Sequence, residues 1–303
     1  MTRWVRLAAT AAWATRTKMA SNLASLPEVE RLSPAVIRIL GGNPGKFTLQ
    51  GTNTYLVGTG AQRLLIDTAE GRPSWIAALK RILEQEEAHV HKALITHWHH
   101  DHVGGIEDLL ELSPSTVVHK FDPTESQQQI TDGQGFEVEG ATLTAVHSPG
   151  HTADHIAFVL RQEDALFTGD NVLGHGTAVF EDLGTYLRSL AKMKPLVKGH
   201  AYPGHGPVLP SAPAKIAEYI SHRKQREDQV IQLLASADSE TADANTGSWT
   251  IMELVKIIYA DVPESLHVPA AGGISQIMRK LEAEDRVKLE DGDRWRLRDR
   301  SSL

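Results

Sequence analysis

The stretch that decides the fold is Thr96-His97-Trp98-His99-His100-Asp101-His102, which is followed by Gly104-Gly105. Four imidazoles and one carboxylate fall within residues 97–102, a density of metal ligands that a solvated loop does not need. Imidazole and carboxylate together suit Zn²⁺, Mn²⁺ or Fe. The chain contains no cysteine, so a structural zinc site built on thiolates is excluded. The stretch therefore predicts a catalytic metal site.

The composition is that of an ordinary globular protein with room for one large and one small domain. The chain has 303 residues, of which 41% are hydrophobic and 23% charged. Its formal charge of −7 argues against a main role in coating nucleic acid, which depends on Lys and Arg at the phosphates. No apolar run approaches the roughly 20 residues that span a bilayer, and a chain without disulfides fits a reducing compartment. We therefore expect no membrane association and a cytoplasmic location.

The first 27 residues allow a second location. They contain no acidic residue, and their basic residues are Arg3, Arg6, Arg16 and Lys18. This composition is typical of a mitochondrial targeting segment, but Met19 offers an alternative start. Residues 1–27 are therefore predicted to be either a flexible tail or a targeting segment.

Strands and helices alternate through the first two thirds of the chain. Short β-branched or apolar runs bounded by glycine-rich segments predict strands, and apolar residues at helical spacing predict helices. The predicted strands are residues 36–40, 53–57, 63–67, 92–96, 142–147, 155–160, 165–169 and a further one leading to Tyr202. The predicted helices are residues 74–86, 103–112 and 180–192. Two strand-rich halves with interspersed helices indicate a core of two layered sheets.

The last third predicts a different architecture. A long polar helix is expected at residues 214–235 and a flexible loop at 238–247. Two helices, at residues 249–259 and 265–283, precede two alternating strands around Asp291-Gly292. Helix, helix and hairpin form the outline of a winged-helix unit. The predicted domains are a catalytic domain at 28–212, a linker at 213–247 and a winged-helix-like domain at 248–303.

The stretch at residues 97–102 resembles the HxHxDH motif of the metallo-β-lactamase superfamily. Three further blocks resemble that family in the right order: Ser148-Pro149-Gly150-His151-Thr152, Phe167-Thr168-Gly169-Asp170 and Tyr202-Pro203-Gly204-His205-Gly206. The resemblance extends over about residues 31–290. It implies an α/β fold, the four-layer αββα sandwich, with a small C-terminal winged-helix domain.

The resemblance also implies two metal ions and their ligands. One ion would be held by His97, His99 and His151, the other by Asp101, His102 and His205, with Asp170 between them. Two Zn²⁺ are expected, with Mn²⁺ or Fe as alternatives. Such a pair, about 3.5–4 Å apart, lowers the pKa of water towards 7 and polarises the oxygen under attack. Asp101 would also carry a proton between the water and the leaving group, a role often given to it in this family.

Several neighbours are expected to support the ligands or to line the substrate pocket. Imidazole ligands need their other N–H held by a carboxylate or carbonyl. The residues proposed for such roles are Asp67, Asn53, His155 and His175, the last as a pocket residue or proton donor. His100 is expected to be exposed, and His147 and His200 match no ligand position. The family usually has glycine two residues after Asp67, where this chain has Ala69, so the turn is expected to differ.

Three segments narrow the resemblance to the lactamase-beta-like subfamily with a C-terminal winged helix: residues 43–55, 174–183 and 253–259. Two of its branches are relevant. One is a mitochondrial endoribonuclease that cuts single-stranded RNA. The other comprises fungal thioesterases that release an aromatic polyketide from the acyl carrier protein (ACP) of a non-reducing polyketide synthase.

Charge favours the thioesterase. Between Arg279 and Arg300 there are eight basic and seven acidic residues, a mixed surface rather than a phosphate track. The predicted partner is therefore an ACP domain, and nucleic acid is a partner only under the ribonuclease alternative. A homodimer is a further expectation that the sequence allows. A pseudoenzyme or scaffold would have lost ligands, whereas all seven are present.

Overall fold

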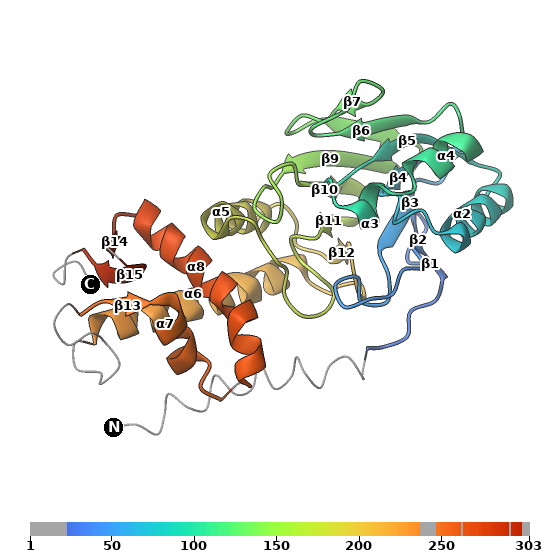
Figure 1. Ribbon diagram of the computed structural model, residues 1–303. Helices are drawn as coiled ribbons and strands as arrows, with labels where there is room; N and C mark the ends of the chain where they lie inside the picture. Colours follow the sequence, from blue (N-terminus) through green and yellow to red (C-terminus); the bar gives the residue numbers. More distant parts are fainter. Residues whose placement is uncertain (1–22, 237–246, 262, 291, 299–303) are drawn as a thin grey trace. The chain divides into compact units, whose positions relative to one another are not determined.

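A computed structural model describes residues 23–236, 247–261, 263–290 and 292–298 (Figure 1). Most of the predicted N-terminal segment and of the predicted loop at 238–247 lies outside these ranges. The chain forms two compact units that divide between Tyr219 and Ile220, within helix α6 (Ala212–Ala235). In the described ranges, no helix has the length and apolar character needed to cross a membrane.

The first unit contains a seven-stranded sheet whose strands follow chain order. The strands are β1 (Val29–Arg31), β2 (Val36–Leu40), β3 (Asn53–Val57), β4 (Gln62–Ile66), β5 (His89–Leu94), β6 (Val117–Lys120) and β7 (Gln128–Gln129). Neighbours from β1 to β4 pair antiparallel, and those from β4 to β7 pair parallel. The parallel part needs crossovers, which helices supply: α2 (Pro73–Gln85) joins β4 to β5, and α3 (His100–Val103) and α4 (Ile106–Leu112) join β5 to β6.

A second sheet of five strands completes the core of this unit. Its order is β12 (Ala201–Pro203), β11 (Ala165–Gly169), β10 (Ile156–Leu160), β9 (Ala141–His147) and β8 (Gly135–Val138). All pairs are antiparallel except β11 with β12, which is parallel. A short 3₁₀ helix, η2 (Arg161–Glu163), turns the chain from β10 to β11.

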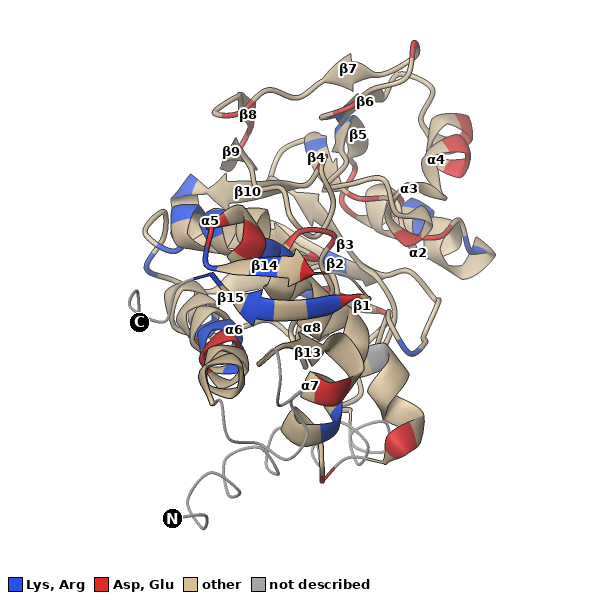
Figure 2. Cartoon of the chain, turned by 60° about the vertical axis from the view of Figure 1, so that its left-hand side comes forward, with Lys and Arg blue, Asp and Glu red and all other residues tan. Residues whose placement is uncertain are grey.

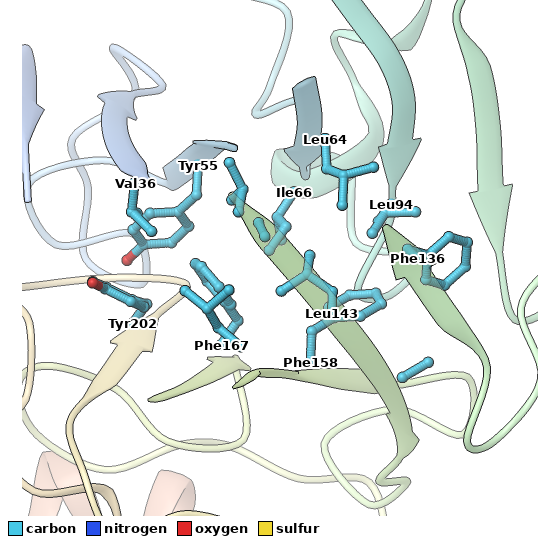
Figure 3. Close-up of a cluster of buried hydrophobic side chains, with 14 of the residues drawn as sticks. Val36, Tyr55, Leu64, Ile66, Leu94, Phe136, Leu143, Phe158, Phe167 and Tyr202 are labelled. Atoms are coloured by element: carbon cyan, nitrogen blue, oxygen red, sulfur yellow. The ribbon is translucent and has the colours of Figure 1, made fainter. Parts of the chain in front are cut away.

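Apolar side chains from both sheets meet in one cluster (Figure 3). Tyr55 and Ile66 come from the first sheet, and Phe158 and Phe167 from the second. The Tyr55 and Phe167 rings pack edge to face, with centroids 5.1 Å apart. Burial of this surface, at roughly 25 cal/mol per Å², is what holds the two sheets face to face.

Helices cover the outer faces of the two sheets. The apolar face of α2, with Trp75 and Leu79 fully buried, packs on side chains of the first sheet that point away from the second. All five residues of β11 are buried, so both faces of that strand are covered, and α5 (Leu183–Met193) lies beside the five-stranded sheet (Figure 1). The arrangement is the predicted αββα sandwich.

Several predicted boundaries were wrong. The strand expected at 92–96 ends at Leu94, and the helix expected at 103–112 is divided at Gly104-Gly105 into α3 and α4. Gly105 has no room for a side chain, since a Cβ there would lie 2.2 Å from the Thr68 carbonyl oxygen. The helix expected from residue 180 begins at Leu183, because the Asp182 carboxylate accepts the Thr185 amide at 2.6 Å and caps it.

The second unit has the elements of a winged helix. They are β13 (Trp249–Thr250), α7 (Ile251–Ile258), the 3₁₀ helix η3 (Glu264–Leu266), α8 (His267–Ala283), β14 (Val287–Glu290) and β15 (Arg294–Leu297). Trp249, predicted as helical, is instead a strand residue opposite Trp295. Thr250 and Glu253 form a capping box, which starts α7 after the strand. Within this unit, Glu227 of α6 pairs with Lys280 of α8 at 2.8 Å.

Candidate metal centre

Each sequence block that carries predicted ligands lies in the loop after a strand. The HxHxDH stretch comes after β5, His151 after β9, Asp170 after β11 and His205 after β12. Two sheets packed face to face bring these four strand ends to one place, although they are far apart in the sequence. The strands are rigid and the loops beyond them are free to present side chains.

The structure brings all seven predicted ligands together in two groups. His97, His99, His151 and Asp170 form the first group. Asp101, His102 and His205 form the second. In each group, one nitrogen or oxygen atom from every residue lies within 4.8 Å of the others. Asp101 and His102 are presented by the single turn of α3, which was not predicted to be helical.

Hydrogen bonds orient the ring nitrogens of the first group. His151 Nδ1 lies 2.7 Å from the carbonyl oxygen of Val179, which can only accept, so Nδ1 carries the hydrogen. In a neutral ring the Nε2 atom then has a lone pair. That atom lies 3.1 Å from His99 Nδ1, which in turn lies 2.9 Å from His97 Nε2. Three ring nitrogens thus point at one small volume, as around a cation.

Asp67 fixes two ligands at once. Its Oδ2 atom accepts the Thr96 hydroxyl at 2.9 Å and lies 2.7 Å from His102 Nδ1. Since the Thr96 hydrogen is used in that bond, its oxygen accepts from His97 Nδ1, at 2.9 Å. Both rings are therefore held with Nε2 free to bind a cation. The role predicted for Asp67 agrees with this geometry, whereas Thr96 was not predicted.

Asp170 belongs to the first group and also lies close to the histidines of the second. Its carboxylate oxygens are 3.7 Å from His151 Nε2, 3.4 Å from His102 Nε2 and 3.3 Å from His205 Nε2. Bonds of 2.0–2.1 Å to a tetrahedral ion separate neighbouring ligand atoms by about 3.4 Å. His102 Nε2 and Asp170 Oδ1 are buried without a hydrogen-bond partner among the described residues. The residues present therefore fit metal ions in both groups.

The pKa values of the metal-free site indicate competition between protons and metal. Burial lowers the pKa of His205, but Asp170 and hydrogen bonds with Asp101 and Asp170 outweigh it and raise this pKa to about 9. Burial likewise opposes the charged form of His102, yet Asp67 and Asp170 hold its pKa well above the usual value. Burial, the largest cause, holds the pKa of His97 well below it. A metal ion must displace the protons of His102 and His205.

Asn53 and His155 are buried, and each holds part of the site. The Asn53 side-chain amide donates to the carbonyls of Pro203 and Gly206, at 2.9 and 2.8 Å, so it fixes the loop that carries His205. His155 Nε2 lies 3.1 Å from the backbone nitrogen of Asp170. Burial, followed by the nearby His151 ring, holds the pKa of His155 well below its usual value.

Four further histidines singled out in the sequence belong to neither group. His175 stands in a loop fastened to the His205 loop, because the Gly174 amide donates to the His205 carbonyl at 2.8 Å. His147 stacks on Phe121, with ring centroids 4.0 Å apart, and His200 faces Glu163. His100 is exposed on α3.

Ala69 occupies a turn of the kind that glycine favours. Its φ of 53° lies in the left-handed region, which glycine adopts without steric cost and alanine seldom does. Gly41 makes room for the alanine methyl group, since a Cβ on Gly41 would lie 2.7 Å from the Ala69 Cβ. The expected difference from the family's turn stays a prediction.

Thr52 is a further site residue that sequence reasoning missed. The Thr52 hydroxyl donates to Asp101 Oδ2 at 3.0 Å. The Asn43 side chain accepts the backbone amide of Thr52 through its oxygen and donates to the Thr52 hydroxyl oxygen through its nitrogen. Both Thr52 and Asn43 lie in the segment that carried the subfamily resemblance, but that resemblance does not say which side chain reaches the site.

Two family models match the chain. The metallo-beta-lactamase superfamily model matches residues 47–120 and 115–205, more than half of the chain. This chain belongs to the metallo-β-lactamase superfamily. The model of the beta-lactamase associated winged helix domain matches residues 250–295. The family and the winged helix predicted from the sequence are thereby confirmed, and a metal-binding site is an expected part of such a fold.

Curated superfamily members resemble the chain over most of its length. "Lactamase-like protein adaB" of Aspergillus niger is 48% identical over 285 residues, which cover 91% of this chain and 90% of that protein. "Atrochrysone carboxyl ACP thioesterase" of Aspergillus chevalieri is 47% identical over 273 residues, covering 89% and 88%.

Among solved structures, a beta-lactamase domain protein from Burkholderia ambifaria has a TM-score of 0.74 at 16% identity, covering 94% of this chain and 98% of that one. A metallo-beta-lactamase family protein from Thermus thermophilus has a TM-score of 0.67 at 22% identity, covering 88% and 100%. At these identities the likeness concerns the fold alone.

Proposed function

We propose that this chain is a dinuclear metal-dependent thioesterase that releases an aromatic polyketide from an acyl carrier protein. One Zn²⁺ would be held by His97, His99 and His151, the other by Asp101, His102 and His205, and Asp170 would bridge them. The observation that carries the hydrolase proposal is the convergence of these seven side chains into two groups with Asp170 between them. The thioester substrate is proposed from relatives at 47% and 44% identity that are named atrochrysone carboxyl ACP thioesterases.

Hydrolysis of a thioester adds the oxygen of water to the carbonyl carbon and breaks the carbon–sulfur bond. Two divalent ions, when bound, supply a hydroxide at neutral pH and polarise the carbonyl. Asp101 is the more accessible of the two carboxylate ligands, with 24% of its side chain exposed against 11% for Asp170. Asp101 would take the remaining proton of the water and pass it to the leaving sulfur. A thiol has a pKa near 8.5, so its thiolate leaves with little help from an acid.

Apolar side chains beside the ligands suit an aromatic acyl group. In residues 23–219, the large hydrophobic side chains that are exposed are Phe47, Trp98, Val179 and Leu196. Trp98 stands between two ligands, and its ring lies 4.6 Å from that of His99. Val179 accepts the His151 hydrogen bond through its carbonyl while its side chain is 61% exposed. A planar polyketide could cover both side chains while its thioester reaches the ions.

The charges of the winged unit favour a thioester over RNA. Cationic and anionic residues lie side by side on β14 and β15 (Figure 2). Arg296 and Lys288 both pair with Glu290, and Arg294 pairs with Glu253 at 3.2 Å. Cations that are neutralised within the unit are poor ligands for a phosphate backbone. We therefore assign catalysis to the domain at 28–212 and no RNA-binding role to the domain at 248–303.

The test compares the two substrates directly. Purified protein loaded with Zn²⁺ is incubated with an aromatic acyl thioester of an ACP and, in parallel, with unstructured RNA, and thiol release and RNA cleavage are measured. We expect thiol release that is lost in Asp170→Ala and kept in His100→Ala, a matched control within the same motif. RNA cleavage that exceeds thiol release and disappears in Asp170→Ala would overturn the proposal.

A further inference from the structure

We propose that His155 is a positioning residue that fixes the bridging carboxylate of Asp170 by accepting the hydrogen bond of the Asp170 backbone amide. His155 lies directly before β10, is fully buried, and is not one of the seven predicted ligands. Its ring lies within the site all the same, with its centroid 5.3 Å from that of His97. The inference rests on the dinuclear centre proposed above.

The donors and acceptors around His155 define its tautomer. A backbone amide can only donate, so His155 Nε2, 3.1 Å from the Asp170 nitrogen, must accept. The hydrogen of a neutral ring then lies on Nδ1, which is 3.0 Å from the Ser148 hydroxyl oxygen. The Asn171 side-chain nitrogen is also 3.0 Å from Nδ1, but it donates its hydrogen to the Ser148 carbonyl at 2.7 Å. The ring therefore links the loop that carries His151, through Ser148, to the turn that carries Asp170.

The close approach of His155 depends on a glycine. Gly169 has a φ of +48°, and a Cβ built on it would lie 2.5 Å from His155 Nε2. The ring thus occupies the space that a side chain at position 169 would fill. Glycine at this position allows imidazole and backbone to meet immediately before the bridging residue.

Other hydrogen bonds hold the shape of the turn, and one of them, from the Asn171 side-chain amide to the Ser148 carbonyl at 2.7 Å, also ties the turn to the loop that carries His151. The Thr168 hydroxyl donates to the Val172 carbonyl at 2.7 Å, and the Asn171 backbone amide donates to the Thr168 carbonyl at 3.2 Å. Both of these bonds lie within the turn. The Asp170 carboxylate must reach both groups of ligands, so a small shift of the turn separates it from one of them. Asn171 and His155 both oppose that shift, and His155 is the one whose side chain contacts the backbone amide of Asp170 itself.

Two substitutions separate the acceptor function from simple filling of space. His155→Gln places an oxygen at the ε position, where it can accept the Asp170 amide. His155→Asn reaches only the δ position, so it can contact Ser148 but not the amide. Both variants remove the aromatic ring, so any loss that stems from the ring is common to both. Zn²⁺ stoichiometry and affinity are measured by chelator competition on the full chain, without reference to activity.

We expect His155→Asn to lower the affinity for the weaker ion at least tenfold, the usual effect of removing a group that orients metal ligands. His155→Gln should stay within about threefold of the unchanged protein. Equal affinities for the two variants, whether both high or both low, would overturn the proposal. If His155→Asn does not fold, Gly169→Ala is used in its place, because the added methyl group pushes His155 Nε2 away from the Asp170 amide while His155 and Asp170 are both kept. Full Zn²⁺ affinity in Gly169→Ala would also overturn the proposal. Fewer than two ions in the unchanged protein would instead contradict the dinuclear centre.

Discussion

Asp67→Asn should disable the metal site while preserving the backbone. Asp67 has a φ of 59°, a left-handed conformation that asparagine tolerates as well as aspartate. The carboxylate accepts three hydrogen bonds: from the Thr96 amide at 2.7 Å, from the Thr96 hydroxyl at 2.9 Å and from His102 Nδ1 at 2.7 Å. An amide has only one oxygen, so its NH₂ group must face at least one of these donors.

The expected loss of stability follows from the less costly of the two orientations that the new amide group can take. With NH₂ at the Oδ1 position, the Thr96 amide loses its acceptor, at a cost of about 1–3 kcal/mol for a buried group. The two bonds at the other oxygen lose the charge that strengthens them, about 1 kcal/mol in total. We therefore expect the metal-free protein to lose about 2–4 kcal/mol of its free energy of unfolding. Less basic rings at His97 and His102 should lower metal affinity about 10- to 100-fold.

Denaturant unfolding of the metal-free protein and chelator competition for Zn²⁺ measure the two effects. Glu107→Gln, the same chemical change on the surface helix α4, is the control and should alter neither. If Asp67→Asn bound Zn²⁺ within twofold of the unchanged protein, the orienting role of Asp67 would be refuted. Normal stability of the metal-free variant would refute the hydrogen-bond argument.

Three further predictions concern the ligands, the protons and the substrate. His205→Ala should lose at least one bound ion, measured by metal analysis, whereas the exposed His100→Ala should keep both. In the metal-free protein the pKa of His205 is raised from 6.5 to about 9, so protonated His205 stabilises the fold fully below about pH 6.5 and loses this effect as the pH rises to 9. Unfolding curves measured between these pH values should show a falling free energy of unfolding, and bound Zn²⁺ should remove this fall. Trp98→Ala should raise KM for an aromatic acyl thioester about 5- to 30-fold, because the lost contact is worth about 1–2 kcal/mol, and should leave KM for a short acyl thioester unchanged. Equal changes in KM for both substrates would argue against Trp98 as an acyl contact.

The periodicity of the chain predicted the main strands and helices but not their ends or their weaker members. Strands β1, β6, β7 and β8 were not predicted, because each has only two to four residues, too few to show a pattern. Trp249 was placed in a helix since it continues an apolar pattern, yet its pairing with Trp295 makes it a strand residue. Cross-strand pairing with a residue far along the chain outweighs local preference.

The sequence by itself determined which residue types are available to bind metal, because ligands of the HxHxDH stretch are neighbours along the chain and the other blocks have recognisable surroundings. Only the tertiary structure decided which nitrogen of each ring is free. The partner that sets the tautomer is remote in sequence: Asp67 for His102, Val179 for His151 and Asp170 for His155. The proton of an imidazole is placed by the donors and acceptors nearest to the ring in space, and these are chosen by how the two sheets and their loops pack.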